Sequence, residues 1–128
     1  MFTNILNRAP CVAALSLLTS APSRAQTVEV ETGVFCDTQK QMERYVALYN
    51  GDTQAALNAV NKEVNDPTAC VYGTIAYIRG AEVATARSRS GTYHVVEVIV
   101  VGFMTHSGFR AAAPAASFSA EKIDERIA

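Results

Sequence analysis

The chain has 128 residues, of which 49% are hydrophobic, and its 11 basic and 12 acidic side chains give a net charge of −1. This length fits one small domain with a modest core. The near balance of charge excludes an electrostatic drive toward nucleic acid or an anionic membrane surface. The chain also lacks a phosphate-binding loop, a nucleophile elbow and a zinc-protease helix, so no motif indicates a reaction.

Residues 1–25 have the layout of a secretory signal peptide. A positive charge at Arg8 precedes an apolar stretch over residues 11–18. Small residues at Ser23 and Ala25 fit the two subsites of signal peptidase. The sequence therefore predicts cleavage directly after Ala25. The chief alternative is a buried N-terminal helix.

The mature domain would comprise residues 26–128, with nine basic and 12 acidic side chains and a net charge of −3. A membrane-spanning helix needs about 20 apolar residues. The apolar run over residues 95–104 is too short for that. We therefore expect a periplasmic or secreted domain with no membrane span.

Two cysteines lie in this domain, Cys36 and Cys70. Thiols in an oxidising compartment usually pair, and the wide spacing excludes a redox motif in which two residues separate the cysteines. No histidine lies between them to complete a metal site. The sequence thus predicts a structural Cys36–Cys70 disulfide, which the chain-entropy model values at roughly 4 kcal/mol.

A strand and a helix are predicted first along the mature chain. In residues 27–35 apolar residues alternate with glutamates. This period of two indicates a strand with one solvent-exposed face. Thr38 and Gln41 then have the spacing of a capping box, with Asp37 as the alternative N-cap. The apolar face of this helix follows the i, i+3, i+4, i+7 rule and consists of Met42, Tyr45, Val46 and Tyr49. Asn50-Gly51 ends the helix.

A second helix is predicted to begin at Asp52 or Thr53 and to end at residues 65–67, Asn-Asp-Pro. Its expected buried stripe consists of Ala56, Leu57, Val60 and Val64. The short link to the preceding helix predicts an antiparallel helix pair. The disulfide would join the two outer ends of that pair.

The remaining chain is expected to be β-structure. Residues 70–78 and 82–88 are predicted strands, with a tight turn between them at Arg79-Gly80 and a second turn at residues 88–91. Residues 93–103 have apolar side chains on both faces, which predicts a central strand covered on both sides.

The C-terminal part is expected to consist of a loop at residues 105–108, a small-residue linker at 111–114, and an edge strand or a frayed helix at 118–126. The predicted fold class is α+β, with the antiparallel helix pair packed on a small antiparallel β-meander of three to five strands.

The histidines do not predict a metal site. His94 lies near the start of the strongest strand and His106 lies just beyond its end. Twelve residues of strand span about 40 Å, so the two side chains cannot share one ion. We expect no metal and no cofactor.

Glu97 and a group of arginines are the possible ligand-binding residues. Glu97 lies between apolar neighbours on the strongest strand, and a buried carboxylate with a raised pKa is a common functional signature. The alternatives are an ion pair with Arg87 on the next strand or simple exposure. The basic side chains concentrate at Arg79, Arg87, Arg89 and Arg110. They predict either a small anion site or a solvated hairpin tip.

Five tyrosines offer a third possibility, either a binding groove or core and rim packing. They are Tyr45, Tyr49, Tyr72, Tyr77 and Tyr93.

The segment from residue 35 to residue 70 resembles a group of short exported proteobacterial proteins of unknown function. The residues that carry the resemblance are Cys36-Asp37-Thr38, Gln41, Val46-Ala47-Leu48, Ala55-Ala56-Leu57, Val60-Asn61 and Cys70, with a looser echo at Ile123-Asp124-Glu125-Arg126. The resemblance implies export and the Cys36–Cys70 bond. It supplies no catalytic residues.

These observations favour a non-enzymatic binding or interaction module with an envelope or extracellular partner. The alternative is a small hydrolase or other enzyme that uses Glu97 with His94 or with the arginine group. A third hypothesis is a structural envelope component, or an inhibitor that presents residues 88–91 to its target.

Overall fold

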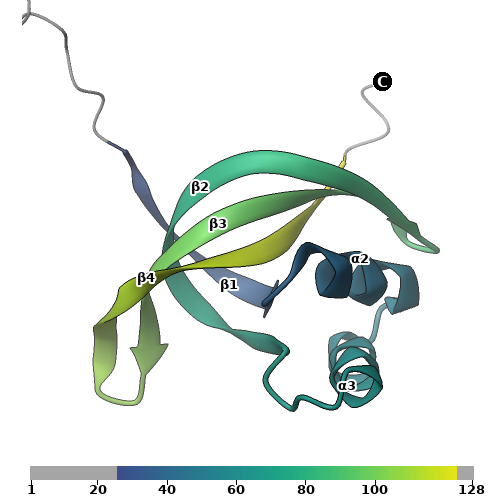
Figure 1. Ribbon diagram of the computed structural model, residues 1–128, viewed down its shortest axis with the longest axis horizontal. Coiled ribbons are helices and arrows are strands. Elements are labelled where there is room, and N and C mark those ends of the chain that lie inside the picture. The colour runs from purple at the N-terminus through teal and green to yellow at the C-terminus, as the bar shows by residue number, and fades with distance from the viewer. Residues whose placement is uncertain (1–25, 124–128) are drawn as a thin grey trace, which may run out of the picture.

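The computed structural model describes residues 26–123 of the chain. The predicted signal peptide (1–25) and residues 124–126 of the last predicted element lie outside the described residues. Figure 1 shows the elements, which are β1 (Val28–Cys36), α2 (Gln39–Leu48), α3 (Thr53–Glu63), β2 (Cys70–Ser88), β3 (Gly91–Thr105) and β4 (Gly108–Lys122). The α+β class is confirmed, with four strands in the described part of the chain. No helix within it is long and apolar enough to cross a membrane.

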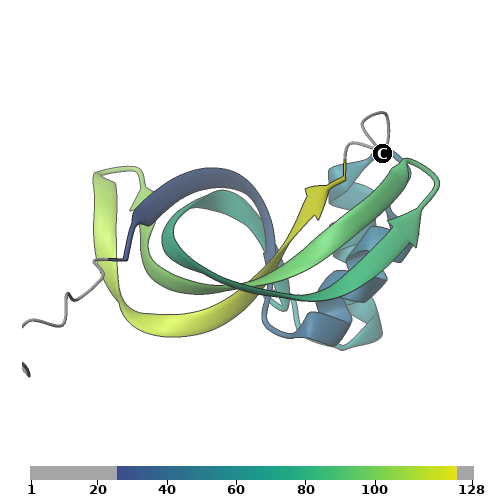
Figure 2. The same ribbon diagram turned by 90° about the horizontal axis from the view of Figure 1, so that it is seen from above.

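The four strands form an antiparallel meander that curls into a barrel, with β1 and β4 meeting at the seam. The seam is narrow, because β1 pairs with β4 only where Cys36 lies opposite Phe118. Next to this pair, the hydroxyl of Ser117 donates a hydrogen bond to the carbonyl of Cys36 at 2.9 Å. Figure 2 shows the two strands close together near the end of β1 and curving apart toward their N-terminal ends.

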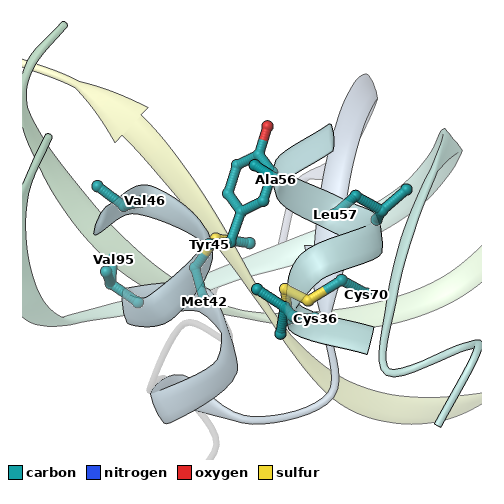
Figure 3. Close-up of a cluster of buried hydrophobic side chains, with 9 residues drawn as sticks. Cys36, Met42, Tyr45, Val46, Ala56, Leu57, Cys70 and Val95 are labelled. Atoms are coloured by element: carbon teal, nitrogen blue, oxygen red, sulfur yellow. A yellow bond between two sulfur atoms is a disulfide. The ribbon is translucent and has the colours of Figure 1, made fainter. Parts of the chain in front are cut away.

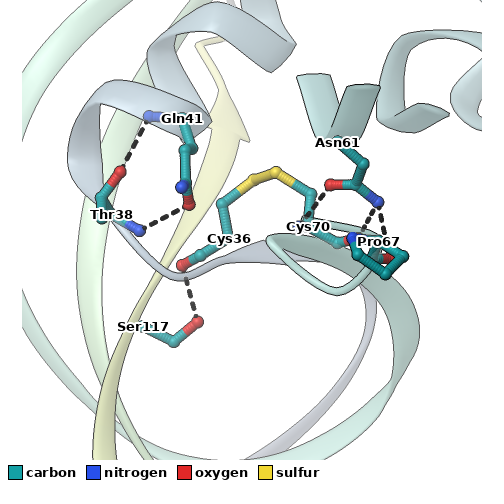
Figure 4. Close-up of a disulfide and its surroundings, with 7 residues drawn as sticks. All are labelled: Cys36, Thr38, Gln41, Asn61, Pro67, Cys70 and Ser117. Carbon is teal, nitrogen blue, oxygen red and sulfur yellow. Dashed lines mark hydrogen bonds between the residues drawn. A yellow bond between two sulfur atoms is a disulfide. The ribbon is translucent and has the colours of Figure 1, made fainter. Parts of the chain in front are cut away.

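The helices α2 and α3 form the connection of a β-hairpin. β1 and β2 pair from Val28 opposite Ile78 to Cys36 opposite Cys70, and both helices lie between these strands in the chain. The predicted Cys36–Cys70 disulfide is confirmed, with the two Cα atoms 4.0 Å apart (Figure 4). The amide of Asp37 extends the pairing by donating to the carbonyl of Ala69 at 2.8 Å. The disulfide therefore closes the helical unit at the point where it joins the sheet.

The helix ends follow their sequence signals. Thr38 is the N-cap of α2 and forms the full capping box with Gln41, so Asp37 is not the cap. Asp52 caps α3 by accepting a hydrogen bond from the amide of Ala55. The predicted burial of Val64 is wrong, because α3 ends at residue 63 and 43% of Val64 remains exposed.

The sheet has a core on each face. One core lies between the helices and the sheet (Figure 3), with Cys36, Met42, Tyr45, Val46, Ala56, Leu57, Val60, Cys70 and Val95 as its buried residues. The other fills the barrel and consists of Phe35, Ile75, Tyr77, Val96 and Val98. β3 contributes to both cores, since Val95 faces the helices while Val96 and Val98 face the barrel interior. The predicted burial of both faces of this strand is confirmed at these positions.

The predicted turn at Arg79-Gly80 is wrong, because β2 continues through it. Register shifts between Arg79 and Glu82 and between Glu82 and Ala84 bend the strand here without ending it. A Cβ atom on Gly80 would lie 2.8 Å from the carbonyl oxygen of Glu97 on β3. Gly80 therefore allows β2 and β3 to approach closely, and such an approach is a common reason for a glycine within a strand.

The predicted linker at residues 111–114 is also wrong, since it lies inside β4. Val100 pairs with Ala115 and Gly102 with Ala111, so three residues of β4 face Val101 alone. Pro114 lies in this bulge, where a missing backbone donor is tolerated. Of the two alternatives for the last element, residues 118–122 adopt the strand.

Candidate functional site

A pocket of about 190 Å³ lies where α2 packs on the sheet. We call it the tyrosine pocket, and its lining consists of Val34, Met42, Tyr45, Val46, Tyr49, Tyr93 and Ala120. The lining residues come from β1, from α2 and its C-cap, from β3 and from β4. All of them are uncharged. The pocket is thus walled by aliphatic and tyrosine side chains, with polar as well as apolar atoms at its surface, and exists only because α2 covers this end of the sheet.

Tyr45 forms the most deeply buried aromatic wall, with 8% of its surface exposed. Its ring centroid lies 5.8 Å from that of Tyr49, with the ring planes tilted by 31°. Burial raises the pKa of Tyr45, although a hydrogen bond with the side chain of Thr53 opposes the shift. The hydroxyl therefore stays neutral at ordinary pH.

Tyr93 forms the wall on the sheet side, and the β2–β3 turn positions it. Its hydroxyl lies 2.7 Å from the hydroxyl of Ser90, which in turn lies 2.9 Å from that of Ser88. The amide of Ser90 also donates to the hydroxyl of Ser88 at 3.1 Å. The turn thus orders its own serines and the Tyr93 side chain together.

The structure brings three of the five tyrosines to one place. Tyr72 lies apart from the pocket on β2, with 60% of its surface exposed. Tyr77 lies in the barrel interior with 3% exposed, and its hydroxyl donates a hydrogen bond to Glu29 at 3.4 Å. Burial, with the nearby carboxylates of Glu31 and Glu29, raises the pKa of Tyr77 to about 12.

A polar cluster joins β2, β3 and β4 at another place. The guanidinium of Arg79 binds Glu121 through two nitrogen–oxygen contacts, one of them 3.0 Å long, and lies 3.9 Å from Glu82. The bond to Glu121 raises the pKa of Arg79. His94 joins the cluster because its Nδ1 atom, shielded from solvent, lies 3.1 Å from a carboxylate oxygen of Glu82. Arg79 is therefore occupied by Glu121, whereas Nδ1 of His94 lies near Glu82 without a hydrogen-bond partner among the described residues.

Glu97 does not join His94 or Arg87. The side chains of Glu97 and His94 are three residues apart on β3, and so they point to opposite faces of the sheet. Arg87 lies opposite Thr92, five positions along β3 from Glu97, or about 17 Å. Glu97 is half-buried, and within residues 26–123 no hydrogen bond or ion pair links it to either residue.

The arginines do not form one group. Arg87 and Arg89 are exposed at the tip of the β2–β3 hairpin, while Arg79 is held by Glu121. Arg110 lies opposite Phe103 beside the β3–β4 turn, where His106 is also exposed. The structure thus supports the solvated hairpin tip over an anion site built from all four side chains.

No group of three or more His, Cys, Asp or Glu side chains within residues 26–123 is arranged to hold a metal ion. Sequence reasoning missed Ser90, which fixes Tyr93 in the tyrosine pocket. The three-residue spacing between Ser90 and Tyr93 across a predicted turn was the available signal for Ser90.

Comparison of the chain with protein-family models, with curated proteins and with solved structures finds no significant match.

Proposed function

We propose that this domain is a non-enzymatic binding module that holds a small apolar or aromatic group of its partner in the tyrosine pocket. The observation that carries the proposal is the pocket itself, with a volume of about 190 Å³ and no charged residue in its wall. An apolar cavity of about 150 Å³ can hold benzene. The pocket therefore has room for a single ring or a branched aliphatic side chain.

The walls suit binding better than catalysis. The lining offers no carboxylate, imidazole or amine to move a proton, and no nucleophile beside a base. A bond to Ser90 holds the hydroxyl of Tyr93 in place before a ligand arrives, and burial restricts the ring of Tyr45. Preordered tyrosines supply contact area at little entropic cost, which is why tyrosine is frequent at binding sites.

We further propose that the domain works in the periplasm or outside the cell. The Cys36–Cys70 disulfide supports this, because such bonds persist in oxidising compartments and are rare in the cytosol. The signal-peptide layout of residues 1–25 agrees with it.

The alternative enzyme hypothesis rests on Glu97 with His94 or the arginines. Opposite faces separate Glu97 from His94, about 17 Å of strand separates it from Arg87, and Arg79 is paired with Glu121. These separations favour the binding module over the enzyme.

The test is an NMR titration of the isotope-labelled domain with p-cresol, a single-ring phenol. We expect saturable shifts at the backbone signals of Tyr45, Tyr49 and Tyr93. Ala120→Leu should fill the pocket and weaken binding at least tenfold. The matched control is Ala116→Leu, on the same face of β4 but exposed. The proposal fails if p-cresol does not bind, or if both variants bind it as well as the parent domain.

A further inference from the structure

Most of one edge of β1 has no strand partner within the described residues 26–123. On one side, β1 pairs with β2 from Val28 to Cys36. On the other side its only pair within residues 26–123 is Cys36 with Phe118. Figure 2 shows β4 curving away from β1 beyond this point. Alternate backbone N–H and C=O groups over residues 28–35 therefore form an open edge, a ready template for a further strand.

This edge alternates in chemistry between its two faces. Val28 and Val30 lie on one face, with 53% and 59% of their surfaces exposed. Glu29 and Glu31 lie on the other face, which continues into the barrel interior, and both are exposed. No ion pair in the described part of the chain neutralises either glutamate. An added strand would therefore meet apolar side chains on one face and two carboxylates on the other.

The charges disfavour a second copy of this chain as the occupant. In an antiparallel pairing of two β1 strands centred on Val30, Glu29 lies opposite Glu31 of the other copy. In a pairing centred on Glu31, the two Glu31 carboxylates lie opposite each other. Like charges directly opposite each other are destabilising. The edge therefore disfavours pairing with a second copy of β1 and favours a strand with basic side chains.

We propose that residues 28–32 of β1 bind an extended peptide segment in which lysine or arginine alternates with apolar residues, as an added strand. Its backbone would bond to the open edge, its basic side chains would face Glu29 and Glu31, and its apolar side chains would cover Val28 and Val30. Backbone bonds supply affinity and alternate side chains supply specificity in this mode of recognition. The surface is separate from the tyrosine pocket, so each proposal can fail alone.

The probe is a dye-labelled, acetylated and amidated peptide of alternating lysine and valine, about as long as β1, measured by fluorescence anisotropy. The parent domain should bind it saturably. Glu31→Lys should weaken binding about tenfold, since it turns a cross-strand attraction into a repulsion. Glu43→Lys makes the same charge change on α2 and should stay within about twofold of the parent. Equal binding by the two variants overturns the proposal.

Two further arms separate strand addition from simple charge attraction. A peptide of the same composition with lysines and valines in separate blocks should bind about tenfold more weakly. In an extended peptide the backbone N–H groups of alternate residues point to the same edge. Methylation of the backbone nitrogen of all lysines, or of all valines, therefore removes the hydrogen-bond donors of one edge only. One of these two peptides should lose binding to the domain and the other should keep it. Undiminished binding of the block peptide, or of both methylated peptides, overturns strand addition.

Exchanging the charges of the domain and of the peptide tests the proposal through a gain of binding. The double variant Glu29→Lys with Glu31→Lys should lose the valine–lysine peptide and bind a valine–glutamate peptide, which also shows that it is folded. Failure to bind the valine–glutamate peptide contradicts the proposal. Concentration-dependent dimerisation of the parent domain that Glu31→Lys alters would make a second copy the occupant instead.

Discussion

The side-chain amide of Asn61 bonds to both backbone groups of Cys70. The amide of Cys70 donates to Oδ1 at 2.8 Å, and Nδ2 donates to the carbonyl of Cys70 at 2.9 Å and to that of Pro67 at 3.0 Å (Figure 4). An α3 side chain thus stands where a neighbouring strand would pair, at the first residue of β2. Asn61 ties the second helix to the disulfide and to the sheet.

Replacing this amide should destabilise the domain. Asn61→Asp keeps the acceptor but removes both donated bonds and places a carboxylate against two carbonyl oxygens. We expect a loss of about 1–3 kcal/mol in the free energy of unfolding, measured with urea. The control is Asn58→Asp one turn earlier, exposed and bonded only to Gln54 among the described contacts, which should change stability by less than about 0.5 kcal/mol. Equal losses would contradict the role assigned to Asn61.

Removing the disulfide should lower stability more than any single hydrogen bond does. The bond closes a loop with a sequence separation of 34 residues. The chain-entropy model gives about 4 kcal/mol for such a closure. The double variant Cys36→Ala with Cys70→Ala should lose a value of that order in guanidinium unfolding. Unchanged stability would show that the helical unit holds to the sheet without it.

Gly80 and Gly73 form a matched pair of strand glycines. Gly80→Ala places a Cβ atom 2.8 Å from the backbone oxygen of Glu97, whereas a Cβ on Gly73 meets nothing within 4 Å. We expect Gly80→Ala to cost about 1–3 kcal/mol because rigid backbone must move. Gly73→Ala should stay within about 0.5 kcal/mol. Thermal unfolding distinguishes them, since 1 kcal/mol shifts the midpoint by about 4–8 °C in a domain of this size. Similar midpoints would refute the close strand approach.

Tyr77 makes stability depend on alkaline pH. Its pKa is raised to about 12, chiefly by burial, whereas an unfolded tyrosine titrates near pH 10. Between these values the folded state keeps a proton that the unfolded state has lost, so the stability present below about pH 10 falls as pH rises toward 12. The full shift corresponds to roughly 2–3 kcal/mol.

Tyr77→Phe removes the ionisable group and should flatten the fall in the free energy of unfolding between about pH 10 and pH 12. Urea unfolding at a series of pH values measures it. Tyr72→Phe, at an exposed tyrosine, should leave the slope unchanged. A slope that Tyr77→Phe does not alter would rule out the buried hydroxyl as its source.

The helical part of the fold was predictable because its signals are local. The capping box at Thr38 and Gln41 and the spacing of Met42, Tyr45 and Val46 involve residues within two turns of each other. The disulfide was equally predictable, since the two cysteines of a domain that is predicted to be exported have one way to pair. Val64 was misassigned because the position at which a helix ends decides which residues its face can bury.

The ends of the strands were harder to predict because they depend on pairing with neighbouring strands. Arg79-Gly80 and the segment at 111–114 contain residues that end most strands, yet bulges carry β2 and β4 through them. β2 has 19 residues, far more than the usual length of about five or six in a strand. The turn-forming residues within it therefore predicted two shorter strands in place of one long strand. The close approach to Glu97 that explains Gly80 exists only once β3 lies beside β2.

The candidate site was predictable only in its α2 half. The four-residue spacing of Tyr45 and Tyr49 places both on one helix face. The approach of Tyr93 needs the β2–β3 hairpin to fold back over that face. The separation of Glu97 from His94 could be deduced from strand geometry alone. The bond between Arg79 and Glu121, and the approach of Glu82 to His94, depend on strand register and cannot be predicted from the chain order.

The helical unit leaves the sheet at Cys36 and returns at Cys70 through Cα atoms only 4.0 Å apart. The ends of this segment lie so close together that a tight two-residue hairpin loop could connect β1 to β2 in its place. The helical unit can therefore be exchanged without a change in the course of the strands, provided that its replacement covers the core at Val95. Such an exchange would reshape the tyrosine pocket while the open edge of β1 stayed as it is.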